Sequence, residues 1–169
     1  MIESAVFTTD DVERYDDPAA ARDAAGTTWV KATDASHGEL ESVAEVFGIH
    51  PLSVEDVSRD VRSKTEEFPG HTFVLAKTAT LRRGDTSFEE EIHSRQVGVF
   101  FGGDWIVTMS TERLDAVERV WAAAVEGDVR VRRLGPDYVA YRVLDRVVDD
   151  YFHLLDEIED SIEAIEESV

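Results

Sequence analysis

The stretch that decides the fold is PDYVAYRVLDRVVDDYFHLLDEIEDSIEAIEESV, residues 136–169. It opens on a proline, a residue favoured at the first position of a helix, and no glycine or second proline follows. Its apolar residues recur at alternating spacings of three and four, the heptad pattern of a helix that packs along one line of contact. We call this line the heptad seam, and its members are Tyr141, Leu144, Val148, Tyr151, Leu155, Ile158, Ile162, Ile165 and Val169.

With a rise of about 1.5 Å per residue, this helix would be roughly 50 Å long, which exceeds the diameter of a domain of this size. We therefore predict a domain in residues 1–135 and, in residues 136–169, the start of a long stalk helix that projects from it. After Arg146 the helix carries nine acids and no Lys or Arg. Acids near the C-terminal end oppose the helix dipole, so the pattern indicates a helix that continues further or lies along a partner.

Upstream of the long helix, the sequence alternates short helices and short strands. A helix is predicted in residues 17–25, where a proline follows an N-capping aspartate, and a strand in residues 27–33. Ser36 and Glu39 match the capping box that opens a helix, and Gly48 supplies its end.

Further along the chain, Pro51 can open another short helix, which would offer Leu52, Val54 and Val57 to the core. Residues 68–110 then read as an antiparallel meander of strands, with turns at residues 83–85 and 102–104. Thr111 is a suitable cap for the helix that follows. Its apolar stripe is Leu114, Val117, Val120, Trp121 and Ala124, and it ends at Gly127.

The composition excludes several classes of protein. The 17 Lys+Arg against 37 Asp+Glu give a net charge of −20, which repels phosphate backbones, so nucleic acid is not expected as a partner. An acid-rich and lysine-poor folded chain is typical of salt-loving microbes, where salt screens the self-repulsion. The chain has no cysteine for disulfides or thiolate metal sites, and no apolar run approaches the length of a membrane span.

The candidate chemistry lies in hard oxygen ligands, because the five histidines form no metal-binding pair and no phosphate loop or serine elbow is present. Glu55 and Asp56 lie between apolar residues of a short predicted helix, and Asp145 lies within the heptad pattern of the long one. Carboxylates suit magnesium, which retains several waters. The residues alone leave open that each is simply a solvated acid.

Two motifs carry a resemblance to a known family. FGIHPLSVEDV (47–57), followed by RSKTEEF (62–68), resembles the N-terminal signature of the CorA family of magnesium transporters. Residues 136–169 are similar to the segment where that family's cytosolic domain continues into its stalk helix. QVGVFFGGDWIVTMS (96–110) is similar to the central strand pair of that domain. The chain departs from the family at Ser63, where proline is usual, and its sequence holds neither the two membrane helices nor the Gly-Met-Asn loop.

The resemblance implies a cytosolic α/β/α sandwich with a mixed, largely antiparallel sheet and a long C-terminal stalk helix. It implies a non-enzymatic role at the cytoplasmic face of the membrane, as the sensing and gating domain of a magnesium or cobalt transporter. Members are homopentamers in which magnesium binds between neighbouring domains and favours the closed state. By position, Glu55, Asp56 and Asp145 match metal-binding acids, and a further ligand lies beyond Val169.

Other readings remain open. In one alternative, His50 and Pro51 only build a turn, and Asp149, Asp150 and Tyr151 have a structural role in the fold and no role in metal binding. Three alternative functions also remain open. The chain could belong to a zinc-transporting branch that shares the domain, or be a magnesium-dependent nucleotide pyrophosphatase, which also uses clustered acids. It could instead be an interaction module that binds a partner helix along the heptad seam. By itself the chain is expected as a monomer or dimer, and it would reach a membrane only through helices absent from this sequence.

Overall fold

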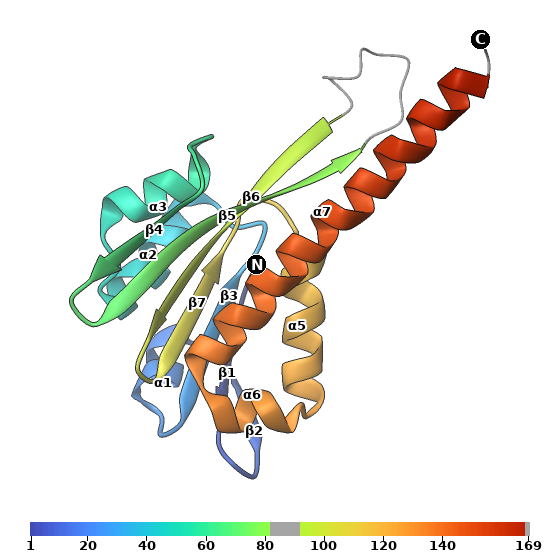
Figure 1. The fold of residues 1–169 in the computed structure, drawn as a ribbon. Coiled ribbons are helices and arrows are strands. Elements are labelled where there is room, and N and C mark those ends of the chain that lie inside the picture. The colour runs from blue at the N-terminus through green and yellow to red at the C-terminus, as the bar shows by residue number, and fades with distance from the viewer. Residues whose placement is uncertain (82–91, 168–169) are drawn as a thin grey trace.

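The computed structural model describes residues 1–81 and 92–167, and these form a seven-stranded sheet with helices on both faces (Figure 1). The strand order is β2-β1-β3-β7-β6-β5-β4, and all neighbours are antiparallel except β3 and β7, which are parallel. The predicted mixed and largely antiparallel α/β/α sandwich is confirmed. The strands are β1 (Ile2–Phe7), β2 (Val12–Tyr15), β3 (Thr27–Ala32), β4 (Lys64–Phe68), β5 (His71–Leu81), β6 (Ile92–Gly102) and β7 (Trp105–Met109).

The first helical layer contains α1 (Pro18–Asp23), α2 (His37–Phe47) and α3 (Pro51–Ser58). The predicted capping box is present at α2: the Ser36 hydroxyl accepts a hydrogen bond from the Glu39 N–H, and the Glu39 carboxylate accepts one from the Ser36 N–H. Gly48 ends α2 in the left-handed conformation, with φ of 65°. The prediction for Leu52 was wrong, because its side chain is 61% exposed while Ser53 turns into the core instead.

The predicted meander is confirmed in β5, β6 and β7, which pair in sequence order. Its turn at residues 102–104 separates β6 from β7, whereas the turn predicted at residues 83–85 lies outside the described residues. Phe73 and Phe100 face each other across β5 and β6 and stack with ring centroids 4.4 Å apart. This pair belongs to the core beneath α2 and α3.

The second layer contains α5 (Asp115–Glu126), α6 (Val129–Leu134) and α7 (Pro136–Glu167). The prediction that Thr111 caps α5 was wrong. The chain stays extended to Leu114, which occupies the N-cap position without a side-chain hydrogen bond. Leu114 is only 1% exposed, so its burial in the core determines where the helix begins.

The long helix α7 begins at Pro136, as predicted, and has two apolar faces. Its buried residues pack against the sheet and α5, and they are Val139, Ala140, Val143, Val147 and Leu154. The heptad seam lies on a different face, and Tyr141, Val148 and Leu155 are 57%, 53% and 58% exposed. In Figure 1 the C-terminal part of α7, drawn in red, extends past the sheet. Along the described ranges of the chain, no helix combines the length and the apolar character needed to cross a bilayer.

Candidate functional site

The site predicted from sequence centres on α3, whose first turn is built by His50 and Pro51. The Nδ1 atom of His50 accepts a hydrogen bond from the Leu52 N–H at 3.2 Å, so histidine here acts as the N-cap. Pro51 occupies the first helical turn, where its missing N–H costs nothing. Both side chains are exposed, and the contacts in the structure give them the turn-building role.

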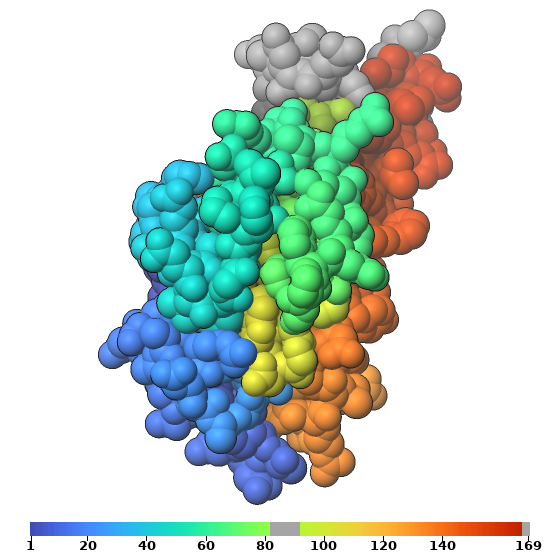
Figure 2. Space-filling model, turned by 90° about the vertical axis from the view of Figure 1, so that its left-hand side faces the viewer, coloured from blue at the N-terminus to red at the C-terminus, as the bar shows by residue number. Residues whose placement is uncertain are grey.

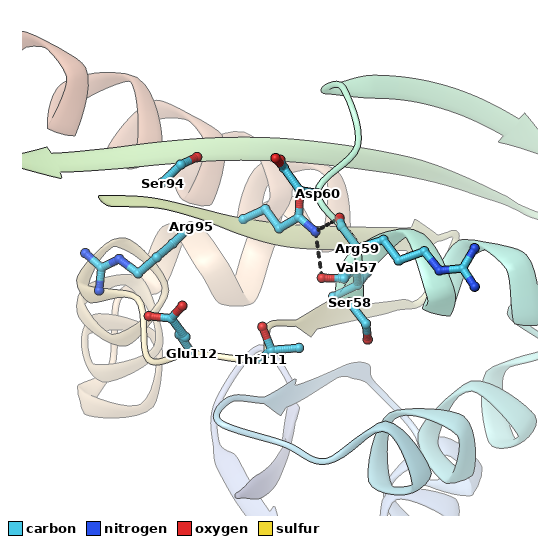
Figure 3. Close-up of a pocket in the computed structure, with 9 residues that line it drawn as sticks. Val57, Ser58, Arg59, Asp60, Ser94, Arg95, Thr111 and Glu112 are labelled. Carbon is cyan, nitrogen blue, oxygen red and sulfur yellow. Dashed lines mark hydrogen bonds between the residues drawn. The ribbon is translucent and has the colours of Figure 1, made fainter. Parts of the chain in front are cut away.

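The C-terminal end of α3 is held by Gln96 of β6. Its Nε2 atom donates to the carbonyl oxygens of Asp56, Val57 and Arg59, at 2.9 Å for Asp56 and 2.8 Å for Val57. Gln96, Val57 and Arg59 line a hollow of about 280 Å³, and Figure 3 shows the Arg59 and Arg95 side chains pointing away from each other there. Because both ends of α3 are fixed, the acids in its middle have defined positions.

Glu55 and Asp56 each pair with a cation of the same chain. The Glu55 carboxylate lies 3.2 Å from Arg59, one turn along α3, and the Asp56 carboxylate lies 2.6 Å from Nζ of Lys64 on β4. Lys64 also contacts Glu66 at 3.0 Å. The pKa of Lys64 is raised above its ordinary value, first by its hydrogen bond to Asp56 and then by that to Glu66.

A hollow of about 420 Å³ opens between α3 and the edge strand β4. Glu55, Asp56 and Lys64 line it together with His50, and Phe68 forms part of its apolar wall. Figure 2 shows the face of the molecule where α2 and α3, in cyan and blue-green, lie beside the green β4 segment. The side chains of Glu55 and Asp56 retain 39% and 23% exposure, so both acids are accessible from this face.

The other predicted acids lie on α7. Asp145 is exposed, whereas Asp149 pairs with Arg146 at 3.4 Å and Asp150 accepts a hydrogen bond from Thr78 at 3.4 Å. Tyr151 lines a second hollow of about 380 Å³ between α7 and β5, and its partial burial raises its pKa above 10.

Lys64 lines both hollows, and it therefore marks the boundary between the acids of α3 and the surface of α7. Within the described ranges, no three His, Asp or Glu side chains of one chain are grouped as ligands of a single metal ion. The donor chemistry still fits magnesium, because the partly exposed Glu55 and Asp56 offer carboxylate oxygens from adjacent positions. Each acid is already paired with a cation, so a divalent ion would have to compete with Arg59 and Lys64.

Sequence reasoning identified the acids but missed their basic partners. The chain has only three lysines, Lys31, Lys64 and Lys77, and every one pairs with an acid. Lys31 is 2% exposed and bridges Glu3 and Glu118. Such scarcity was a usable signal, because a lysine retained in so acidic a chain is expected to serve a specific contact.

The sheet and its two helical layers form a three-layer α/β/α domain with a projecting C-terminal helix, and the acids described above lie on its surface. The family of CorA-like Mg²⁺ transporter proteins matches residues 24–169, and the chain belongs to this family. The cobalt/magnesium transport protein CorA of Thermotoga maritima is 31% identical over 165 residues, which cover 96% of this chain and 45% of that protein. A putative metal ion transporter of Bacillus subtilis, YfjQ, is 26% identical over 83% of this chain and 41% of its own length.

Among solved structures, the soluble domain of CorA from Methanocaldococcus jannaschii superimposes with a TM-score of 0.73. It is 20% identical in sequence, and the match covers 99% of this chain and 64% of that one. At this identity the likeness establishes the fold. The chain spans less than half the length of these two curated relatives.

Proposed function

We propose that the chain is the cytosolic regulatory domain of a CorA-like magnesium transporter, with cobalt as a second ion, at the cytoplasmic face of the cell membrane. Membership of the CorA-like family and the match to a CorA soluble domain support this proposal. The observation that carries it is the pair Glu55 and Asp56, partly exposed side by side on a helix that is fixed at both ends. The relatives are named as transporters, which supports a role other than catalysis.

In the proposed mechanism, magnesium binds between copies of the chain. Carboxylates on neighbouring copies repel until a divalent ion bridges them, so ion binding favours a packed ring of subunits, which we propose to be a homopentamer. Asp145 of α7 would supply a second carboxylate surface. Loss of the ion would restore the repulsion and loosen the ring, and the ion can bias this equilibrium only by its preference for the packed state.

A thermal melt in high potassium chloride tests the magnesium site. Magnesium at about 100 times its dissociation constant stabilises a protein by about 2.7 kcal/mol per site that binds only the folded state. We expect a smaller gain for this chain, because the resemblance places one ligand beyond Val169. Asp56→Ala should lose the gain, whereas Asp10→Ala, which changes an exposed acid remote in sequence, should keep it. An equal magnesium response in the wild type and Asp56→Ala would reject the site.

A further inference from the structure

A hollow of about 490 Å³ lies at one end of the sheet, between two tight turns and the start of α7, and we call it the turn hollow. It is lined by Gly70 of the β4–β5 turn, by Gly102 and Gly103 at the β6–β7 turn, and by Asp137 in the first turn of α7. In Figure 1 these segments lie at the end of the sheet away from the projecting end of α7. A Cβ atom added at Gly102 would lie 2.9 Å from the carbonyl oxygen of Gly70, so the two turns pack closely against each other.

The turn hollow is lined by two acids and by no lysine or arginine. Glu67 of β4 and Asp137 of α7 are both exposed, and neither forms an ion pair with another residue of the ranges 1–81 and 92–167. The imidazole of His71, which also lines the hollow, does not offset these charges at neutral pH, because burial lowers its pKa. The hollow therefore attracts a cation.

The side chains around the two acids favour an organic cation over a metal ion. In the part of the chain that the structure describes, no three His, Asp or Glu side chains are grouped around one metal position. Phe68 and Phe101, both half-buried, add aromatic surface to the lining, and aromatic rings attract ammonium groups. Nε2 of His71 is buried without a hydrogen-bond partner among the described residues, which costs free energy unless a partner reaches it. An alkyl amine combines positive charge, N–H donors and apolar methylene groups in one molecule.

We propose that the turn hollow binds an aliphatic diamine or polyamine. One ammonium group pairs with Glu67 and another with Asp137, and the methylene groups between them lie along Phe68 and Phe101. Because the two acids belong to different elements, a bound diamine links β4 to the start of α7. This inference goes beyond the proposed regulatory function, because it requires no divalent ion and does not involve the acids of α3.

Isothermal titration calorimetry of the full chain with 1,4-diaminobutane tests the proposal, in EDTA and at a fixed potassium chloride concentration. Glu67→Gln/Asp137→Asn removes both charges and keeps the side-chain size at exposed positions. Asp23→Asn/Glu45→Gln removes the same net charge from exposed acids outside the hollow and is the matched control. We expect the first variant to weaken diamine binding at least about tenfold and the control to leave it unchanged. Butylamine, which has a single ammonium group, should bind the wild type more weakly than the diamine does.

A second pair of variants blocks the turn hollow without removing an acid. A Cβ atom added at Gly103 or at Gly38 would meet no atom within 4 Å, so both positions accept a side chain. Gly103→Lys places a cation of the chain itself at the hollow and should weaken diamine binding at least about tenfold, whereas Gly38→Lys, which adds the same charge on α2, should not. The NMR signals of the His71 ring should shift when the diamine is added to the wild type. Circular dichroism confirms that each variant is folded.

Equal diamine binding by the wild type, by Glu67→Gln/Asp137→Asn and by its matched control would reduce the effect to attraction by the net charge of −20 and overturn the proposal. No diamine binding to the wild type, or a His71 ring whose signals do not respond to the diamine, would also overturn it. Retained diamine binding by Asp56→Ala, with its magnesium response lost, separates the turn hollow from the metal site and supports the proposal.

Discussion

Replacing Lys64 with methionine tests whether this lysine competes with a divalent ion for Asp56. Methionine keeps most of the side-chain length and its packing near Phe73 but removes the ammonium group, which lies 2.6 Å from Asp56 and 3.0 Å from Glu66. The side chains of Lys64 and Asp56 are 33% and 23% exposed, so water screens the pair only in part. We therefore expect a loss of about 1 to 2 kcal/mol in the free energy of unfolding.

The same substitution should strengthen magnesium binding. A cation beside Asp56 repels an incoming divalent ion, and its removal is expected to raise magnesium affinity about tenfold, which corresponds to about 1.4 kcal/mol. Urea unfolding gives the stability, and isothermal titration calorimetry gives the affinity. Lys77→Met is the matched control, because Lys77 pairs with Asp60, whose side chain is 90% exposed. If Lys64→Met leaves magnesium affinity unchanged, or if both variants raise it equally, competition at Asp56 is refuted.

The remaining predictions concern the packing that positions α3 and the hairpin beside it. In Gly98→Ala the added Cβ would lie 2.4 Å from Cγ2 of Val57, so the Val57 side chain or the helix that carries it must shift, and chemical denaturation should show a loss of about 1 to 3 kcal/mol. Unaltered stability would show that Val57 does not pack on β6 as described. Burial lowers the pKa of His71, which stacks on Phe68, and Glu67 and Asp137 line the same hollow. The unfolded chain binds a proton on His71 more readily than the folded chain does. The contribution of His71 to the stability of the fold is therefore present above about pH 6.5 and is lost as the pH falls through the pKa of the folded chain. His71→Phe should flatten the pH dependence of stability in unfolding curves measured below and above about pH 6.5. A pH dependence equal to that of the wild type would contradict the role given to His71. Ser36→Ala should cost about 1 kcal/mol of stability by removing the α2 cap, and a thermal melt that matches the wild type would contradict the role of the cap.

The sequence predicted the elements whose local signals are strong. The capping residues and Gly48 bounded α2, and the unbroken heptad pattern placed the start of α7 at Pro136. It missed β1, β2, β4 and α6. Of these, β2 (VERY) and β4 (KTEEF) are short, polar and located at the two edges of the sheet, where alternation of apolar residues is weak. The seam spacing identified one apolar face of α7 but not the second, because a single heptad register describes only one contact line.

The acids of the site were found through a motif, but their environment could not be. The pairing of Asp56 with Lys64 joins α3 to an edge strand, and the clamp from Gln96 joins α3 to a strand 39 or 40 residues further along the chain. Such contacts depend on how the helices pack on the sheet, and they produce no periodic pattern in the local sequence. The exposure of Leu52 illustrates the same limit, since a helix of eight residues tolerates several rotations about its axis.

The most direct test of the central claim, that a divalent ion joins carboxylates of separate chains, is sedimentation velocity of the chain with and without magnesium. At a potassium chloride concentration that screens the net charge of −20, the account predicts that magnesium shifts the chain to a larger species. The double variant Glu55→Gln/Asp56→Asn should remain unshifted. If magnesium binds to the wild-type chain but leaves its sedimentation unchanged, or if the double variant associates equally well, the claim is contradicted.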